Sequence, residues 1–118
     1  MGPRVAGAQL AGPGDVNADR DIAVTDNAEK KRFETRIEGS TAFVDYLRHG
    51  DTIWLTHTEV PHELEGRGVG SALAKHILDY ATVNSLNVVP ACAFIEDYIG
   101  SHPEYASLVK RERAPKQR

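Results

Sequence analysis

The chain contains a single cysteine, Cys92, which excludes any disulfide within one molecule. Few cysteines are typical of proteins kept in a reducing compartment, so we expect a cytoplasmic protein. No apolar run approaches the ~18 residues that a membrane-spanning helix requires. The first residues also lack the sustained apolar core of a signal peptide. We therefore expect neither membrane insertion nor secretion.

A strong charge of either sign is missing as well. The 14 Lys and Arg residues stand against 17 Asp and Glu residues, which gives a net charge of -3 at pH 7. Such a small net charge does not attract nucleic acids or membranes over the whole surface. The local exception is the basic segment 110–118 at the C-terminus. We interpret it as a solvated tail rather than a nucleic-acid-binding arm.

Large apolar residues are scarce in the first part of the chain. Residues 1–28 are rich in Gly and Pro and then in Asp, so little burial is available to offset the entropy lost on ordering. We predict a flexible N-terminal tail over residues 1–28, a single domain over 29–110 and a basic tail over 111–118. Within the first tail, Ile22 to Val24 could form a short edge strand.

The next part of the chain alternates between apolar and polar residues, which is typical of half-buried strands. The first two predicted strands are separated by a turn at Gly39-Ser40, and the second and third by a hairpin turn at His49-Gly50-Asp51. Strands in this order indicate an antiparallel meander. Its predicted strands cover residues 32–38, 41–47 and 52–60.

Three glycines within five residues, Gly66, Gly68 and Gly70, follow the third strand. They open a predicted amphipathic helix over residues 66–85. A strand, a glycine-rich turn and a helix N-terminus form an anion site, because free backbone N–H groups and the helix dipole point at the ligand. Glycine has no Cβ to block the close approach of a phosphate. The pattern therefore predicts a phosphorylated ligand.

Two common phosphate motifs do not fit this turn. A P-loop has Lys followed by Ser or Thr after its glycines, whereas Gly70 is followed by Ser71 and an alanine. A Rossmann fingerprint has an acidic residue at the end of the next strand. Here a short apolar strand over 86–90 ends without one, and a helix over 92–100 follows. The elements instead predict a mixed α/β (α+β) domain with a β-α-β unit and a C-terminal helix around a mixed sheet.

This order of elements, with Gly68-Val69-Gly70 after the strand, resembles the GNAT superfamily of acetyltransferases. The superfamily signature is Gln or Arg, two residues, Gly, one residue, and Gly or Ala, and Glu65 departs from it at the first position. The runs LTHTEVP and VVPACAFIEDYIGSHPEY are similar to small, minimal single-domain members, over about Phe33 to Val109. The resemblance implies an N-acetyltransferase that uses acetyl-coenzyme A and no metal.

The resemblance also implies which residues act. His57 and Cys92 would be the catalytic pair, with Arg67 supplying the charge that Glu65 does not. We expect His57 on one strand face with Ile53 and Leu55. We also expect it near Cys92, because His57 lies near the end of the third strand and Cys92 lies just past the end of the next, parallel strand. The implied cofactor-binding residues are Thr58, Glu59, Val60, Arg67, Gly68, Val69, Gly70 and Ser71.

Two mechanisms and two functions stay open at this point. His57 could take a proton from an attacking amine, or from Cys92 so that the thiolate becomes acetylated. We favour direct transfer, because binding both substrates together needs no covalent intermediate. The alternative function is a non-catalytic module that binds coenzyme A or acyl-coenzyme A. The acceptor would be a protein, a peptide or a small polyamine-like amine, and the protein a monomer or homodimer.

Overall fold

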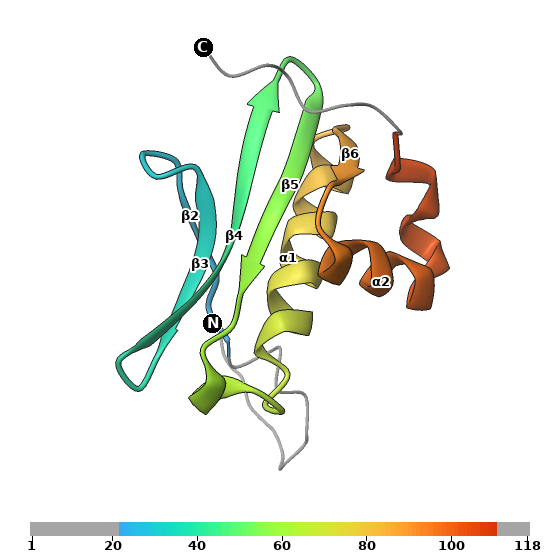
Figure 1. Ribbon diagram of the computed structural model, residues 1–118. Coiled ribbons are helices and arrows are strands. Elements are labelled where there is room, and N and C mark those ends of the chain that lie inside the picture. The colour runs from blue at the N-terminus through green and yellow to red at the C-terminus, as the bar shows by residue number, and fades with distance from the viewer. Residues whose placement is uncertain (1–21, 111–118) are drawn as a thin grey trace, which may run out of the picture.

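A single five-stranded sheet organises the domain in the computed structural model, which describes residues 22–110 (Figure 1). The strands lie side by side in chain order, β2-β3-β4-β5-β6. In sequence the elements are β2 (Thr25–Asn27), β3 (Arg32–Ile37), β4 (Ser40–His49), β5 (Thr52–Glu59), η3 (His62–Leu64), α1 (Val69–Val83), β6 (Asn87–Pro90), α2 (Ala93–Ser101) and η4 (Pro103–Leu108).

The sheet is mixed, as predicted. β2 to β5 are joined antiparallel, and β6 then pairs parallel to β5 after the chain has crossed over through α1. Gly50, with φ of +61°, makes the tight turn between β4 and β5. The expected meander, β-α-β unit and C-terminal helix are thus all present, and the predicted α+β fold class is confirmed.

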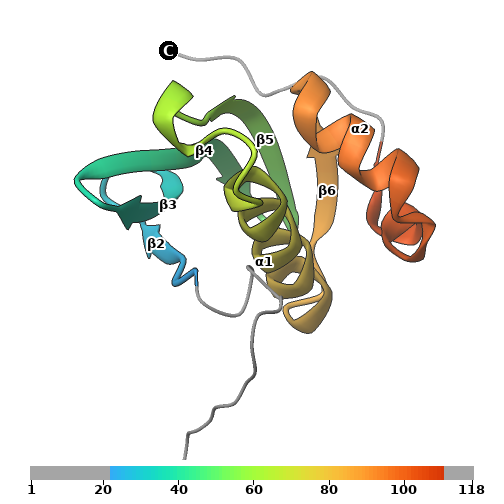
Figure 2. The same ribbon diagram turned by 90° about the horizontal axis from the view of Figure 1, so that it is seen from below.

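The hydrophobic core lies between one face of the sheet and the helices. Phe33, Val44 and Leu55 on the strands pack in one cluster with Leu73 and Ile77 of α1. α2 and η4 add Ile95, Ile99 and Tyr105 to the same cluster, so these elements share a side of the sheet with α1 (Figure 2). Within residues 22–110, none of the helices has the length and apolar character needed to cross a membrane.

The start of the domain differs from the sequence-based prediction. The expected edge strand at Ile22 to Val24 is wrong, because the strand that pairs with β3 is Thr25–Asn27. Ile22 and Val24 instead pack against the core without strand pairing. Tyr46 donates a 2.7 Å hydrogen bond to the Asp26 carboxylate, which helps to hold β2 in place. Residues within the predicted 1–28 tail therefore complete the sheet, while 1–21 and 111–118 lie outside the described residues.

The start of α1 also differs from the predicted helix over 66–85. Gly66 and Gly68 have φ values of +80° and +78°, which lie outside the right-handed helical region. They shape a turn that links η3 to α1, and the helix begins at Val69.

Candidate functional site

The N-terminus of α1 is open to an anion. Gly68 is the N-cap and has no side chain to bond the first N–H groups, and the first turn contains no acidic residue. The first intrahelical bond runs from the N–H of Ala72 to the Gly68 carbonyl, at 3.0 Å. The preceding N–H groups of the helix therefore point outward with the positive end of the dipole.

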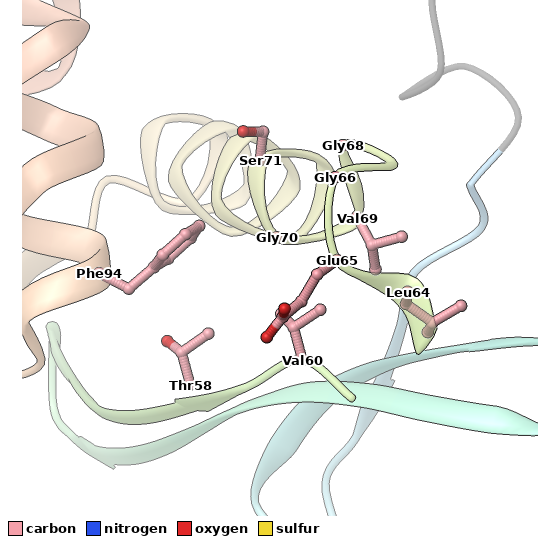
Figure 3. Close-up of a pocket in the computed structure, with 10 residues that line it drawn as sticks. All are labelled: Thr58, Val60, Leu64, Glu65, Gly66, Gly68, Val69, Gly70, Ser71 and Phe94. Atoms are coloured by element: carbon pink, nitrogen blue, oxygen red, sulfur yellow. The ribbon is translucent and has the colours of Figure 1, made fainter. Parts of the chain in front are cut away.

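A cavity of about 540 Å³ opens in front of this helix end (Figure 3). It lies between the end of β5, the glycine turn and the first residues of α1 and α2. A cavity of this size falls within the range of small-molecule sites. Its lining consists of Thr58, Val60, Leu64, Glu65, Gly66, Gly68, Val69, Gly70, Ser71 and Phe94.

Most of the residues expected to hold a cofactor lie at this cavity, and two do not. Thr58, Val60 and the run Gly68 to Ser71 line it. Glu59 and Arg67 are absent from the lining, and the guanidinium of Arg67 instead bonds the Glu38 carboxylate at 3.1 Å. That ion pair directs the Arg67 side chain to the β3–β4 turn, so in this structure the guanidinium does not line the cavity.

A β-bulge decides where His57 points. Tyr46 pairs with Leu55, but Asp45 pairs with His57, so Thr56 is an extra residue in β5. Thr56 also donates a side-chain hydrogen bond of 3.3 Å to the Asp45 carbonyl. Because the extra residue interrupts the alternation of side chains, the expectation that His57 shares a face with Ile53 and Leu55 is wrong. His57 lies on the face of its partner Asp45, away from the core.

The surroundings of His57 follow from this placement. Its Nε2 atom lies 3.0 Å from the Glu59 carboxylate, and both side chains are about half exposed. Its ring centroid lies 6.2 Å from that of Phe43, which stacks under the Arg32 guanidinium at 4.4 Å. His57 is therefore a solvent-accessible, carboxylate-paired imidazole on the sheet face opposite α1.

Cys92 lies on the other side of the sheet. It is the N-cap of α2, is partly buried and packs against the core cluster. Its Sγ atom lies 3.3 Å from the hydroxyl of Thr58, whose cross-strand partner is the core residue Val44. Cross-strand partners share a face, so Thr58 and Cys92 meet on the helix side. Neither Cys92 nor His57 is part of the cavity lining: Cys92 contacts the lining residue Thr58, and His57 lies across the sheet from it.

Each of the two residues lies two positions after the last β5–β6 pair, Leu55 and Pro90. Pairing of β5 with β6 ends at Leu55 and Pro90, followed by a 2.9 Å hydrogen bond from the Ala91 N–H to the Leu55 carbonyl. β5 continues to Glu59. Over its last residues, the edge of β5 that faces away from β4 has no strand partner within the described range 22–110. This exposed backbone edge is accessible from the cavity.

Sequence reasoning did not identify Phe94 as a site residue. The side chain packs against Gly70, where an added Cβ would lie 2.7 Å from the tip of the Phe94 ring. Gly70 is therefore needed for this aromatic contact, in addition to any role in approaching a phosphate. The position of Phe94, in the first turn of α2 two residues after Cys92, is the only signal in the sequence that places it near the site.

The chain is similar to known proteins in sequence and in fold. Residues 32–108 match the family model of the GCN5-related N-acetyl-transferase. Protein NATD1 of Xenopus tropicalis is 32% identical over 85 residues, covering 70% of this chain and 78% of that protein. Protein NATD1 of Homo sapiens is 33% identical over 85 residues, with 70% and 75% covered. The solution structure of a GCN5-like protein from Staphylococcus aureus superimposes with a TM-score of 0.61 at 22% identity, covering 77% and 90%.

Proposed function

The chain belongs to the GCN5-related N-acetyltransferase family, and on that premise we propose that it transfers acetyl from acetyl-coenzyme A to an amine. The observation that carries the proposal is the uncapped N-terminus of α1, opening into a 540 Å³ cavity beside the unpaired end of β5. An anion bound at that helix end is favoured by the outward N–H groups and the dipole.

The residues of the cavity fit a phosphorylated, partly apolar molecule. The run Gly68 to Ser71 would hold the phosphates, while Val60, Leu64 and Phe94 offer apolar contacts. When bound, acetyl-coenzyme A supplies an activated acetyl thioester. One lining residue, Glu65, does not fit an anion, and the charge of Arg67 is engaged by Glu38.

His57 and Cys92 would act from opposite faces of the sheet. His57 would accept the proton of an amine arriving on the face away from α1, since imidazole titrates near neutral pH. The Glu59 carboxylate, 3.0 Å away, would hold the ring and stabilise the imidazolium that forms. Cys92, on the cavity side, would donate a proton to the departing thiolate.

Direct transfer is favoured over an acetylated Cys92. The thiol of Cys92 contacts the Thr58 hydroxyl, and the imidazole of His57 contacts Glu59. A base and a nucleophile acting together lie within hydrogen-bond reach of each other, and these two lie on different faces. His57 is therefore better placed to activate an amine than to deprotonate Cys92.

The substitution Ser71→Glu tests the cofactor site without weakening the fold. A carboxylate in the first turn of a helix interacts favourably with the dipole, so the thermal stability should be kept or increased. The same carboxylate would lie in the cavity lining and repel phosphates. We expect acetyl-coenzyme A to bind roughly three- to tenfold more weakly by calorimetry, because two like charges about 5 Å apart in a partly exposed site repel each other by that much.

Ser107→Glu is the matched control, because Ser107 is exposed in η4 and outside the cavity lining. It adds the same charge and should leave the affinity for acetyl-coenzyme A unchanged. Equal affinities in wild type and both variants would exclude the proposed cofactor site.

The second candidate function is a non-catalytic module that binds coenzyme A or an acyl-coenzyme A. Two observations favour this module: Glu65 lies in the cavity lining, and Arg67 is paired with Glu38. Both lower the expected affinity for an anionic cosubstrate. Such a module would bind acetyl-coenzyme A without turnover of any amine. The acceptor of the enzyme would be a protein, peptide or polyamine-like amine that reaches His57 on the exposed face.

A further inference from the structure

Glu65 places a negative charge in the cavity that would hold the negatively charged phosphates of the proposed cosubstrate. Among the described residues that line the cavity, Glu65 is the one ionisable side chain. In Figure 3 it extends from the glycine turn into the space between β5 and the first turn of α1. The carboxylate therefore faces the same space as the outward N–H groups of the helix.

The cations near this carboxylate offset it only in part. The Nδ1 atom of His62 lies 3.3 Å from the Glu65 carboxylate, but the His62 side chain is 96% exposed. Solvent screens such a pair strongly, so its contribution is small. Arg67 is directed to Glu38 at 3.1 Å. The cavity thus presents a helix dipole that attracts anions and a carboxylate that repels them.

We propose that Glu65 is a specificity-determining residue that limits the affinity of the cavity for phosphorylated molecules. This inference rests on the proposed function, because coenzyme A is the phosphorylated molecule considered. Repulsion between like charges applies to acetyl-coenzyme A and to the product coenzyme A alike, since both carry the same phosphates. Glu65 therefore weakens the binding of both, which shortens the time that product occupies the site.

Calorimetric titration of coenzyme A into the Glu65→Gln variant at low salt tests this role. Gln keeps the size of the side chain and removes its charge. Two charges about 5 Å apart in a partly exposed site correspond to roughly a three- to tenfold change in affinity. We expect the dissociation constant to fall by that factor, and the gain to shrink in high salt, where charges are screened.

Glu63→Gln is the matched control. Glu63 lies in η3 close to Glu65 in sequence, but its carboxylate accepts a 2.5 Å hydrogen bond from the Ser40 hydroxyl and is not part of the cavity lining. The substitution changes the net charge by the same amount. It should leave the affinity for coenzyme A within twofold of wild type. Pantetheine, which carries no phosphate, should bind wild type and Glu65→Gln equally.

The outcomes separate this inference from the proposed function. If wild type binds coenzyme A and Glu65→Gln binds it no more tightly, the role of Glu65 is refuted while the cofactor site stands. An equal gain in Glu63→Gln, or an equal gain for pantetheine, refutes it too. If neither wild type nor variant binds coenzyme A, the proposed function fails and this inference fails with it.

Discussion

His57 and Cys92 lie on opposite faces of the sheet, next to the point where β5 and β6 stop pairing. The bulge at Thr56 turns His57 toward Asp45 and away from the core. Cys92 contacts Thr58 on the helix face at 3.3 Å. A thioester bound where β5 and β6 stop pairing would meet a base, His57, on one face and a proton donor, Cys92, on the other. The two residues would then have different roles that mutation can separate.

Replacing His57 with alanine should impair the chemical step and leave cofactor binding intact. General-base catalysis contributes roughly 10²- to 10⁴-fold, so we expect kcat to fall by at least about 10²-fold. The dissociation constant of acetyl-coenzyme A should stay within twofold, because His57 is not part of the cavity lining. Release of coenzyme A measures the first quantity and calorimetry the second.

His62→Ala serves as the control for that experiment, since the His62 side chain is almost fully exposed and contacts the Glu65 carboxylate rather than His57 or Cys92. It should retain wild-type kcat. A His57→Ala enzyme with unchanged kcat would remove His57 from the mechanism.

Whether Cys92 becomes acetylated during turnover distinguishes a proton donor from a nucleophile. If acetyl is passed directly to the amine, Cys92→Ala should retain measurable transfer, with kcat reduced through loss of the proton donor. Mass spectrometry of wild type mixed with acetyl-coenzyme A alone should show no acetylated Cys92 accumulating at the rate of turnover. An acetyl-cysteine that forms and decays at that rate would contradict direct transfer.

Gly70→Ala should disturb the aromatic wall of the cavity. The added Cβ would lie 2.7 Å from the tip of the Phe94 ring, so the partly exposed ring must move. Alanine is favoured over glycine within a helix by up to about 1 kcal/mol, so thermal stability should change little. Affinity for acetyl-coenzyme A should fall several-fold by calorimetry, because ring and methyl group then compete for the cavity. Wild-type affinity in this variant would show that the Phe94 position is irrelevant to binding.

Much of the fold could be predicted from the sequence, because alternating and helical periodicities report directly on burial. The strand pairs, α1 and the parallel β6 follow from those patterns. The bulge at Thr56 could not be predicted, since the alternation of β5 reads continuously through it and only cross-strand pairing reveals the extra residue. The prediction of the sheet face on which His57 lies was therefore wrong, whereas the prediction that His57 lies near the end of this strand was right.

The glycine turn was also predictable only in part. Its place after β5 and before α1 was predictable, and so was the open helix N-terminus. The sequence did not predict that the three glycines are required for different structural reasons. Gly66 and Gly68 adopt positive φ, whereas Gly70 accommodates Phe94, a residue of another helix. Contacts between distant segments, such as this one and the Arg67–Glu38 ion pair, leave no local trace in the sequence.

A partly buried hydrogen bond between Asp79 of α1 and Tyr105 of η4 gives the stability of the domain a pH dependence. Burial alone would raise the pKa of Asp79, but hydrogen bonds from Tyr105 at 2.6 Å and Lys75 at 2.9 Å lower the pKa below its ordinary 3.8. A depressed pKa in the folded state adds stability above pH 3.8, and that stability is lost as the pH falls through the folded value.

Tyr105→Phe should remove part of that link. We expect a loss of about 1 kcal/mol in the free energy of unfolding at pH 7, after allowing for the partial exposure of Asp79. The difference from wild type should shrink at acid pH, where the carboxyl is protonated. Urea unfolding of both proteins at pH 7 and pH 2 measures this difference. The same difference at both pH values would show that the hydrogen bond from Tyr105 to Asp79 does not contribute to stability.

The most direct test of the central claim is the steady-state release of coenzyme A from acetyl-coenzyme A across a panel of lysine peptides and polyamines. The proposed enzyme predicts amine-dependent release by wild type, acetylated amine as product, and loss of at least about 10²-fold in His57→Ala. Tight binding of acetyl-coenzyme A with no amine-dependent release, the same in wild type and His57→Ala, would contradict it and identify a binding module.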